Sequence, residues 1–244
     1  MTHNILRQIL DERPKFHRGE TEIRGRFPIG KSLLNRPEEI RLIKNTYTCY
    51  GIDKEIANFI YNYVNSESNT LETGAGISTL IFALKMSKHI VITPNKPEII
   101  AIKKYAKQKK INFDNTTFVT EESNKFLPQY KARNLDLVFI DGKHAFPWPI
   151  VDWFYTSDKL KKGGYIILDD VQIYSVTILR DFMKEDPHWE LFKSFKDKTI
   201  VFRKISSSIS NVAWHMQPYL MNRLAKKSFK ENILNNLRGF LNSH

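Results

Sequence analysis

One stretch, from Leu135 to Val171, constrains the fold more than any other part of the 244-residue chain. It begins and ends with apolar runs, Leu135–Ile140 and Tyr165–Leu168, and a helix-like segment lies between them. Both runs are almost continuously apolar, which is typical of strands in a parallel sheet that is covered on both faces. The lysines and glycines of residues 161–164 predict the end of the helix. The stretch therefore predicts a strand–helix–strand unit of an α/β fold.

Acidic side chains follow both predicted strands. Asp141 comes directly after the first strand, and Asp169 and Asp170 come directly after the second. Ligands of such sheets bind beyond the carboxyl ends of the strands, so the three carboxylates are expected to converge there with His144 nearby. Clustered carboxylates predict a bound cation. Two other interpretations stay open, in which Asp141 only holds a cofactor and Asp170 only caps the next helix.

A glycine loop precedes this stretch, within residues 69–84. A short strand ends at Glu72-Thr73, and Gly74-Ala75-Gly76 leads into a helix whose first turn contains Ser78. Glycines allow close approach of the backbone to a ligand, and a helix N-terminus offers unpaired N–H groups to an anion. Glu72 is placed to accept hydrogen bonds from a ligand ammonium group, or else is an ordinary carboxylate at a strand end.

Two further strands are expected at residues 89–93 and 116–120. In nucleoside-binding sheets the first of these usually ends in an acid that holds the ribose hydroxyls. Here the nearest candidates are Thr93, Asn95 and the less well placed Glu98. After the second strand, Glu122 and Ser123 are candidates for contact with a nucleobase, although capping of a surface helix explains Ser123 as well.

The rest of the chain predicts three parts. Residues 1–37 read as an arm with a short helix, and a helix is expected after Pro37 at residues 38–45. Residues 38–205 form the domain, which closes with a hairpin at 189–205 that contributes an antiparallel strand. Residues 206–244 predict a basic amphipathic helix that packs on the domain or a dimer partner, or lies on an anionic membrane surface. Its apolar face is expected to contain Leu220, Leu224, Ile233, Leu237 and Leu241.

The composition of the chain bears on the cellular compartment and on the kinds of partner that are expected. The net charge is +12, but the lysines are spread along the chain without a recognised nucleic-acid motif, which favours a solvated basic surface over a nucleic-acid partner. Cys49 is the single cysteine, so no disulfide within the chain is expected. The N-terminus lacks an apolar signal region, and no stretch approaches the roughly 20 apolar residues that span a bilayer. These features predict a cytoplasmic protein.

Three motifs together resemble those of the class I S-adenosylmethionine (SAM)-dependent methyltransferases. They are ETGAG after the first strand, LDLVFIDGKH at the fourth strand and KKGGYIILDDV at the fifth. The Asp-Gly-x-His pattern is similar to that of catechol-type O-methyltransferases and related bacterial enzymes. The resemblance covers about residues 38–205. It implies an α/β fold with a doubly wound, mostly parallel, seven-stranded Rossmann-like sheet and a C-terminal antiparallel hairpin strand.

The resemblance also implies roles for the candidate site residues. Glu72, Gly74 and Gly76 would line the methionine part of SAM, with Ser78 close to its carboxylate. Asp141 and His144 would form the catalytic pair, with His144 as the base or as a residue that orients the acceptor. A divalent cation such as Mg²⁺ would bind to Asp141, Asp169 and Asp170. The chain departs from the family in its Asp-Asp at the fifth strand, where Asp-Asn is usual, and in lacking an acid after the second strand.

The resulting hypothesis is SAM-dependent O-methylation of a small hydroxylated metabolite or a sugar, since an acidic edge is expected on an otherwise basic protein. The aromatic residues at 146, 148, 153 and 154 are expected to wall the acceptor pocket or to pack in the core. A nicotinamide-dependent oxidoreductase is disfavoured because the loop lacks a third glycine. A non-catalytic member of the fold has no physical need for clustered carboxylates. A nucleic-acid methyltransferase is disfavoured because no Asn/Asp-Pro-Pro-Tyr motif is present.

Overall fold

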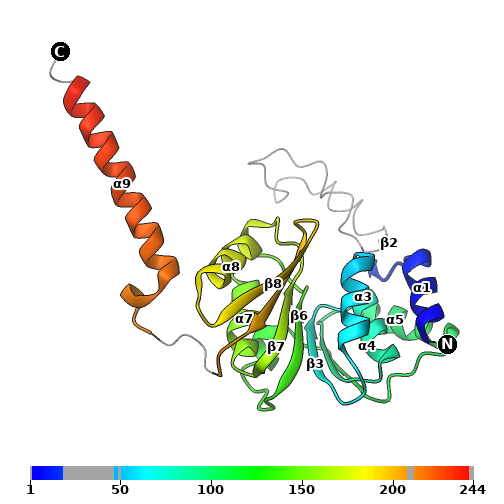
Figure 1. Cartoon of the computed structure of the whole chain (residues 1–244). Coiled ribbons are helices and arrows are strands. Elements are labelled where there is room, and N and C mark those ends of the chain that lie inside the picture. Colours follow the sequence, from blue (N-terminus) through cyan, green and yellow to red (C-terminus); the bar gives the residue numbers. More distant parts are fainter. Residues whose placement is uncertain (1, 19–46, 49–50, 208–211, 242–244) are drawn as a thin grey trace.

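A seven-stranded sheet forms the centre of the protein (Figure 1). The computed structural model describes residues 2–18, 47–48, 51–207 and 212–241. In this part of the chain the strand order is β5-β4-β3-β6-β7-β9-β8. The strands are β3 (Asn69–Thr73), β4 (Lys88–Ile92), β5 (Thr116–Val119), β6 (Leu135–Ile140), β7 (Leu160–Leu168), β8 (Trp189–Phe195) and β9 (Thr199–Lys204).

Five of these strands are parallel, and β9 and β8 complete the sheet as a hairpin. β9 pairs antiparallel with both β7 and β8, so it lies between them. The hairpin turns at Lys196 and Asp197, whose positive φ values of 48° and 54° suit a tight turn between twisted antiparallel strands. The fold class predicted from the sequence is therefore confirmed.

Helices cover both faces of the sheet. Successive residues of a strand point to opposite faces, so they belong to two different buried clusters. Leu137 and Phe139 belong to one buried cluster, whereas Val138 and Ile140 belong to the other. The first cluster is covered by α1 (Thr2–Glu12), α3 (Lys54–Tyr63), α4 (Ile77–Leu84) and α5 (Lys96–Gln108). The second is covered by α6 (Ser123–Phe126), α7 (Trp148–Ser157) and α8 (Tyr174–Glu185).

The predicted helix end at residues 161–164 is wrong. α7 ends at Ser157, and these residues lie inside β7. The pairing of β6 with β7 has a register shift here, and Gly163 has a φ of +84°. A Cβ on Gly164 would lie 3.0 Å from the carbonyl oxygen of Asp136. The glycines thus serve an irregularity in the sheet rather than a helix terminus.

The N-terminal segment is attached to the domain core. The short helix predicted there is α1, and Leu6, Ile9, Leu10 and Phe16 belong to the first buried cluster. A two-residue strand, β1 (His17–Arg18), follows and pairs with β2 (Tyr47–Thr48). The helix predicted at residues 38–45 lies outside the described residues.

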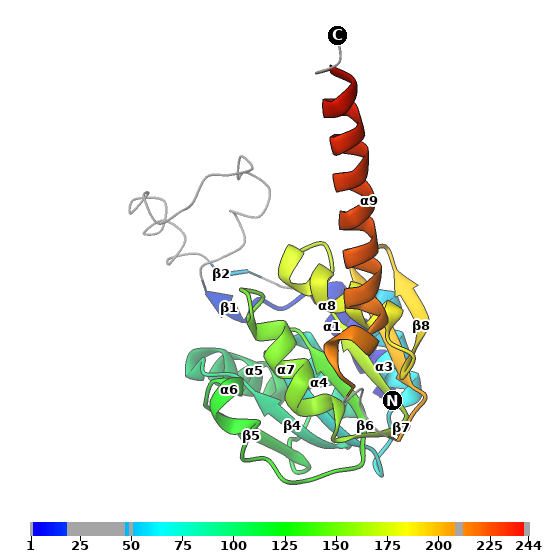
Figure 2. The ribbon, with the colours of Figure 1, turned by 90° about the vertical axis from the view of Figure 1, so that its left-hand side faces the viewer.

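The C-terminal helix α9 (Pro218–Leu241) extends away from the domain (Figure 2). It follows a 3₁₀ turn, η3 (Trp214–Met216), and contacts α8 near its own first turns. A continuous helix turns about 100° per residue, so Ile233 lies about 140° from Leu220 around the axis, and the predicted apolar face would span about half of the circumference. The side chains of Leu237 and Leu241 lie outside the described part.

None of the helices in the described residues is both long and apolar enough to cross a membrane.

Candidate active site

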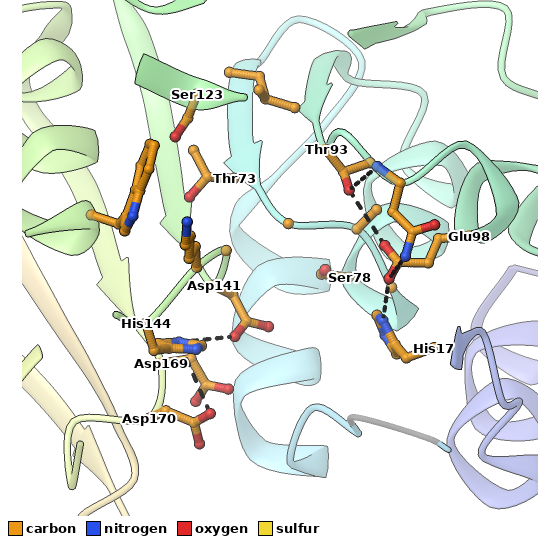
Figure 3. A pocket seen from close by; sticks show the side chains of 18 of the residues that line it. His17, Thr73, Ser78, Thr93, Glu98, Ser123, Asp141, His144, Asp169 and Asp170 are labelled. Atoms are coloured by element: carbon orange, nitrogen blue, oxygen red, sulfur yellow. Dashed lines mark hydrogen bonds and ion pairs between the residues drawn. The ribbon is translucent and has the colours of Figure 1, made fainter. Parts of the chain in front are cut away.

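A cavity of about 790 Å³ opens at the carboxyl ends of β3, β4, β6 and β7 (Figure 3). This volume lies in the usual range for pockets that bind small molecules. The glycine loop after β3 and the loop after β6 both line it, as does the segment after β7. The cavity is therefore at the edge of the sheet where the sequence predicted a ligand site.

Gly74 allows the loops after β3 and β6 to pack directly against each other. Its φ is +88°, and its N–H donates to the carbonyl oxygen of Ile92 at 2.9 Å. A Cβ at this position would collide with the carbonyl oxygen of Asp141. Gly74, Gly76 and Ser78 all line the cavity, as predicted for residues that contact a cofactor.

Glu72 lies behind the glycine loop and does not line the cavity. Its buried carboxylate accepts hydrogen bonds from Ser78 Oγ, at 2.6 Å, and from Thr79 Oγ1. The Thr79 hydroxyl in turn accepts a hydrogen bond from the Gly76 N–H at 3.0 Å, and His89 Nε2 lies 3.3 Å from Glu72 Oε1. Glu72 therefore stabilises the glycine loop through its hydrogen bonds, whereas the sequence predicted a contact with the ligand.

Three polar residues after β4 converge around one carboxylate. Asn95 Nδ2 donates to Glu98 Oε1 at 2.5 Å, and Thr93 Oγ1 donates to Glu98 Oε2 at 3.4 Å. Glu98 reaches back from the first turn of α5, so its carboxylate lies next to the strand end. All three line the cavity. Glu98 thus supplies the acid that the sequence lacks immediately after this strand.

Glu122 and Ser123 line the cavity next to β5. The capping role considered for Ser123 is not observed, because α6 begins at this residue and its N-cap makes no side-chain hydrogen bond. Behind Ser123 and Thr73 lies Asp152 of α7, which is 1% exposed. Burial raises the pKa of the Asp152 carboxyl to about 6, although the nearby Ser123 and Thr73 hydroxyls oppose the increase.

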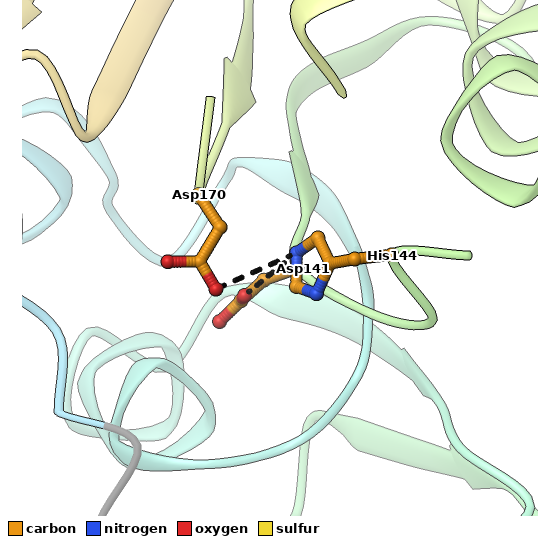
Figure 4. A group of neighbouring side chains, drawn as sticks. All are labelled: Asp141, His144 and Asp170. Atoms are coloured by element: carbon orange, nitrogen blue, oxygen red, sulfur yellow. Dashed lines mark ion pairs between the residues drawn. The ribbon is translucent and has the colours of Figure 1, made fainter. Parts of the chain in front are cut away.

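Asp141, His144 and Asp170 all line the cavity, and their side chains face one another (Figure 4). His144 Nε2 lies 3.6 Å from Asp141 Oδ1 and 3.9 Å from Asp170 Oδ2. The loop that carries His144 is fixed by Ser175 of α8, whose hydroxyl donates to the His144 carbonyl oxygen. Burial, together with the nearby charges of Asp169 and Asp170, raises the pKa of Asp141 well above its usual value.

Asp169 is held by the hairpin instead of joining this group. Its two carboxylate oxygens accept hydrogen bonds from Lys198 Nζ, at 2.9 Å, and from Thr199 Oγ1. Lys198 also lies 3.7 Å from Asp170 Oδ1. Burial lowers the pKa of Lys198, but the charge of Asp169 and the hydrogen bond to it raise the pKa above its usual value, so Lys198 is cationic.

A divalent cation therefore fits a different set of residues from the one predicted. One ligand atom from each of Asp141, His144 and Asp170 lies within 4.8 Å of the others, whereas both oxygens of Asp169 already have partners. Asp170 has a φ of +54° and does not cap α8, whose N-cap is Ile173. The capping interpretation of Asp170 is thus wrong.

The aromatic residues after β6 divide between the cavity and other surroundings. Trp148 lines the cavity, with Lys143 Nζ 4.3 Å from the centroid of its ring. Trp153 packs against Phe182 and Trp189, while the side chains of Phe146 and Phe154 are largely exposed. Trp148 is the one of the four predicted aromatic residues that walls the cavity.

His17 and Lys198 are charged or titratable cavity residues that were missed from the sequence. Nothing in the sequence around His17 relates it to a sheet edge that begins some fifty residues later. Lys198 could have been found, because an antiparallel strand paired with the fifth strand must begin where that strand ends.

The chain is similar to a protein-family model and to solved structures of methyltransferases. Residues 71–171 match the model of a methyltransferase domain family. An O-methyltransferase from Bacillus cereus, solved with S-adenosylhomocysteine (SAH), is 14% identical with a TM-score of 0.53, and the alignment covers 65% of this chain and 84% of that one. An O-methyltransferase from Streptomyces achromogenes, solved with SAM, is 10% identical with a TM-score of 0.54, covering 65% and 83%. A methyltransferase from Geobacter sulfurreducens is 12% identical with a TM-score of 0.53, covering 76% and 94%.

No curated protein sequence matches the chain significantly. Residues 71–171 thus match a methyltransferase family model, and the domain shares the fold of class I SAM-dependent methyltransferases.

Proposed function

We propose that this methyltransferase domain transfers the methyl group of SAM to a hydroxyl oxygen of a small acceptor, such as a hydroxylated metabolite or a sugar. The observation that carries the proposal is the division of one cavity into two halves. A glycine loop and a helix N-terminus lie on one side, and Asp141 with His144 lies on the other. SAM supplies an electrophilic methyl group on a sulfonium, so the protein mainly has to orient two reactants and activate the acceptor oxygen.

The first half of the cavity suits the cofactor. The N-terminus of α4 begins directly after Gly76, and its backbone N–H groups, that of Ser78 among them, would bind the carboxylate of the methionine part. Glu98, with Thr93 beside it, would accept hydrogen bonds from the ribose hydroxyls. Glu122 and Ser123 would contact the base, and Trp148 offers it an aromatic surface.

The second half suits acceptor activation. A hydroxyl is a poor nucleophile at neutral pH, and His144 Nε2 would take its proton as the methyl group is transferred. Asp141 and Asp170 would stabilise the resulting imidazolium, because a carboxylate oxygen of each lies within 3.9 Å of Nε2. The positive charge of Lys198, next to Asp169 and Asp170, limits the negative potential that these acids impose on a deprotonated acceptor.

We further propose that Mg²⁺ assists the transfer. Asp141, His144 and Asp170 would hold the cation, which when bound lowers the pKa of an acceptor hydroxyl. The same Nε2 atom cannot both ligate a metal and accept a proton. Metal assistance would therefore give the role of base to another group or to solvent.

Calorimetric titration of SAM into the purified protein, once with Mg²⁺ and once with EDTA, tests the proposal. Micromolar binding in both conditions supports the methyltransferase without the metal, while binding or acceptor turnover that needs Mg²⁺ supports both parts. Absence of SAM binding in both conditions would contradict the proposed function.

Asp141→Asn should abolish acceptor turnover. Asp158→Asn is the matched control, because Asp158 lies at the C-terminal end of α7, which is remote from the cavity.

A further inference from the structure

The carboxylate of Glu98 has a neighbour that comes from the N-terminal segment. His17 Nδ1 lies 3.1 Å from Glu98 Oε1, the same oxygen that accepts the hydrogen bond from Asn95 Nδ2 (Figure 3). The side chains of His17 and Glu98 are 14% and 13% exposed, and both line the cavity. Whereas Oε1 has these two close partners, Oε2 accepts a long hydrogen bond from Thr93. Oε2 is therefore the oxygen better placed to accept a hydrogen bond from a ligand hydroxyl.

The helix before His17 is fixed to the helix that carries Glu98. Glu12, at the end of α1, accepts hydrogen bonds from Tyr105 Oη, at 2.6 Å, and from Lys109 Nζ. The rings of Phe16 and Tyr105 meet edge to face at 5.7 Å. Since Tyr105 lies on α5 and Lys109 directly follows it, the N-terminal segment and the carrier of Glu98 form one packed unit.

The other edge of the His17 ring faces the glycine loop. A Cβ added at Gly76 would lie 3.4 Å from His17 Nε2. The imidazole is therefore located between the loop that would bind the methionine part of the cofactor and the acid that would bind its ribose.

We propose that residues 2–18 are an integral part of the nucleoside site, in which His17 is a positioning residue that orients Glu98 toward the ribose hydroxyls. This inference rests on the proposed use of SAM. In the tautomer with a proton on Nδ1, His17 donates to Oε1 and leaves the free lone pairs of Oε2 directed into the cavity. Docking of α1 and binding of the cofactor then stabilise each other, because coupling between two binding events is reciprocal.

The test measures calorimetric affinities for SAH and for its 2′-deoxyribose analogue in three variants. His17→Leu removes the donor, and we expect about a tenfold loss of SAH affinity, together with loss of the preference over the deoxy analogue. His17→Gln keeps a donor and should retain much of both. His215→Leu, an exposed histidine next to α9, is the matched control and should match the wild type.

A second readout separates positioning from a general loss of structure. Hydrogen exchange should show that SAH protects the amides of α1 in the wild type but not in His17→Leu, while α8 exchanges alike in both proteins. If the wild type binds SAH and His17→Leu keeps the same affinity and the same preference for the ribose hydroxyl, the inference is overturned and the proposed function stands. If the wild type binds no SAH, the proposed function fails and this inference fails with it.

Discussion

The Asp152 carboxyl is buried behind the cavity wall, where its pKa of about 6 exceeds the usual 3.8. The folded state thus binds this proton more tightly than the unfolded state does. The resulting contribution to stability is complete at pH values below 3.8 and is lost as the pH rises toward 6. Above that pH the chain carries a buried charge at a constant cost.

Asp152→Asn should therefore stabilise the protein at neutral pH. A difference of about two pKa units corresponds to about 2–3 kcal/mol in the free energy of unfolding at pH 7.5, and the gain should vanish near pH 4. Urea unfolding at both pH values measures it. The half-exposed Asp158→Asn should show no such pH dependence, and an equal effect of Asp152→Asn at both pH values would contradict the assignment.

Lys198 provides a second prediction at this scale. Lys198→Met leaves Asp169 with Thr199 as its remaining partner and Asp170 without the nearby cation. Because about a third of the Lys198 side chain is exposed, the expected loss is limited to about 1–2 kcal/mol in the free energy of unfolding at pH 7.5. Lys196→Met, in the same turn, should be neutral, and an equal loss in both variants would mean that the ion pairs add no stability.

Individual side chains were the part least predictable from the sequence. The edge of the sheet and most cavity residues, among them Gly74, Ser78 and Asp141, followed from the order of strands and loops. The partners of those residues did not. Glu72 has the sequence context of a ligand contact, but Ser78 and Thr79 turn its carboxylate into the protein. A hydrogen bond between residues distant in sequence has no local periodicity that could reveal it.

At the scale of elements, β9 connects the sheet to α7 through a buried lysine. Lys204 Nζ donates to the carbonyl oxygens of Ser157, at 2.7 Å, and Leu160, at 2.8 Å. These carbonyls lie at the end of α7 and the start of β7, so one side chain serves the orphan acceptors of a helix terminus and fixes a two-residue connection.

Lys204→Ala should cost about 2–4 kcal/mol in the free energy of unfolding, because two buried carbonyl oxygens lose their partner. Chemical denaturation followed by tryptophan fluorescence measures the loss. Lys162→Ala, on the exposed part of β7, should change stability by less than about 0.5 kcal/mol. A Lys204 variant as stable as the control would show that water replaces the ammonium group.

Element boundaries were predicted well where the apolar run was continuous, as in β6. The prediction failed at residues 161–164, where lysines followed by glycines have the composition of a helix C-terminus. There Leu160 pairs with Leu135, and this contact extends β7 over four residues that have no strand propensity of their own. Tertiary pairing overrides local preference at such positions.

At the scale of the whole molecule, α9 is attached at one end. The ring of Tyr219 meets Phe182 at 5.7 Å, and Arg223 Nη1 donates to Glu185 Oε1 at 2.6 Å. Beyond these contacts, Met221, Leu224, Phe229 and Ile233 are exposed. Basic residues lie beside these apolar side chains. Binding to a dimer partner and binding to an anionic surface therefore both stay predictions for this helix.

A chain that ends at residue 207 should fold and bind SAH with unchanged affinity, because the contacts of α9 lie on α8 and not at the cavity. Loss of the ion pair, the ring contact and the hydrogen bond from Asn222 to Glu185 should lower the free energy of unfolding by about 1–2 kcal/mol. Light scattering of both chains measures whether α9 mediates self-association, and sedimentation with anionic vesicles measures whether it binds lipid. Loss of SAH binding on truncation would contradict the separation of α9 from the site.

The position of β9 also bears on how the protein emerges from a ribosome. β9 is the last strand to be synthesised, yet it lies between β7 and β8 and carries Thr199 beside the turn lysine that holds Asp169. When a nascent chain has emerged only as far as β8, the neighbour of β8 in the sheet is still missing. The acidic edge of the sheet then also lacks the ammonium group of Lys198 in its final position. Completion of the sheet and neutralisation of this edge are thus one late event, so a stalled or prematurely terminated chain cannot present a finished site.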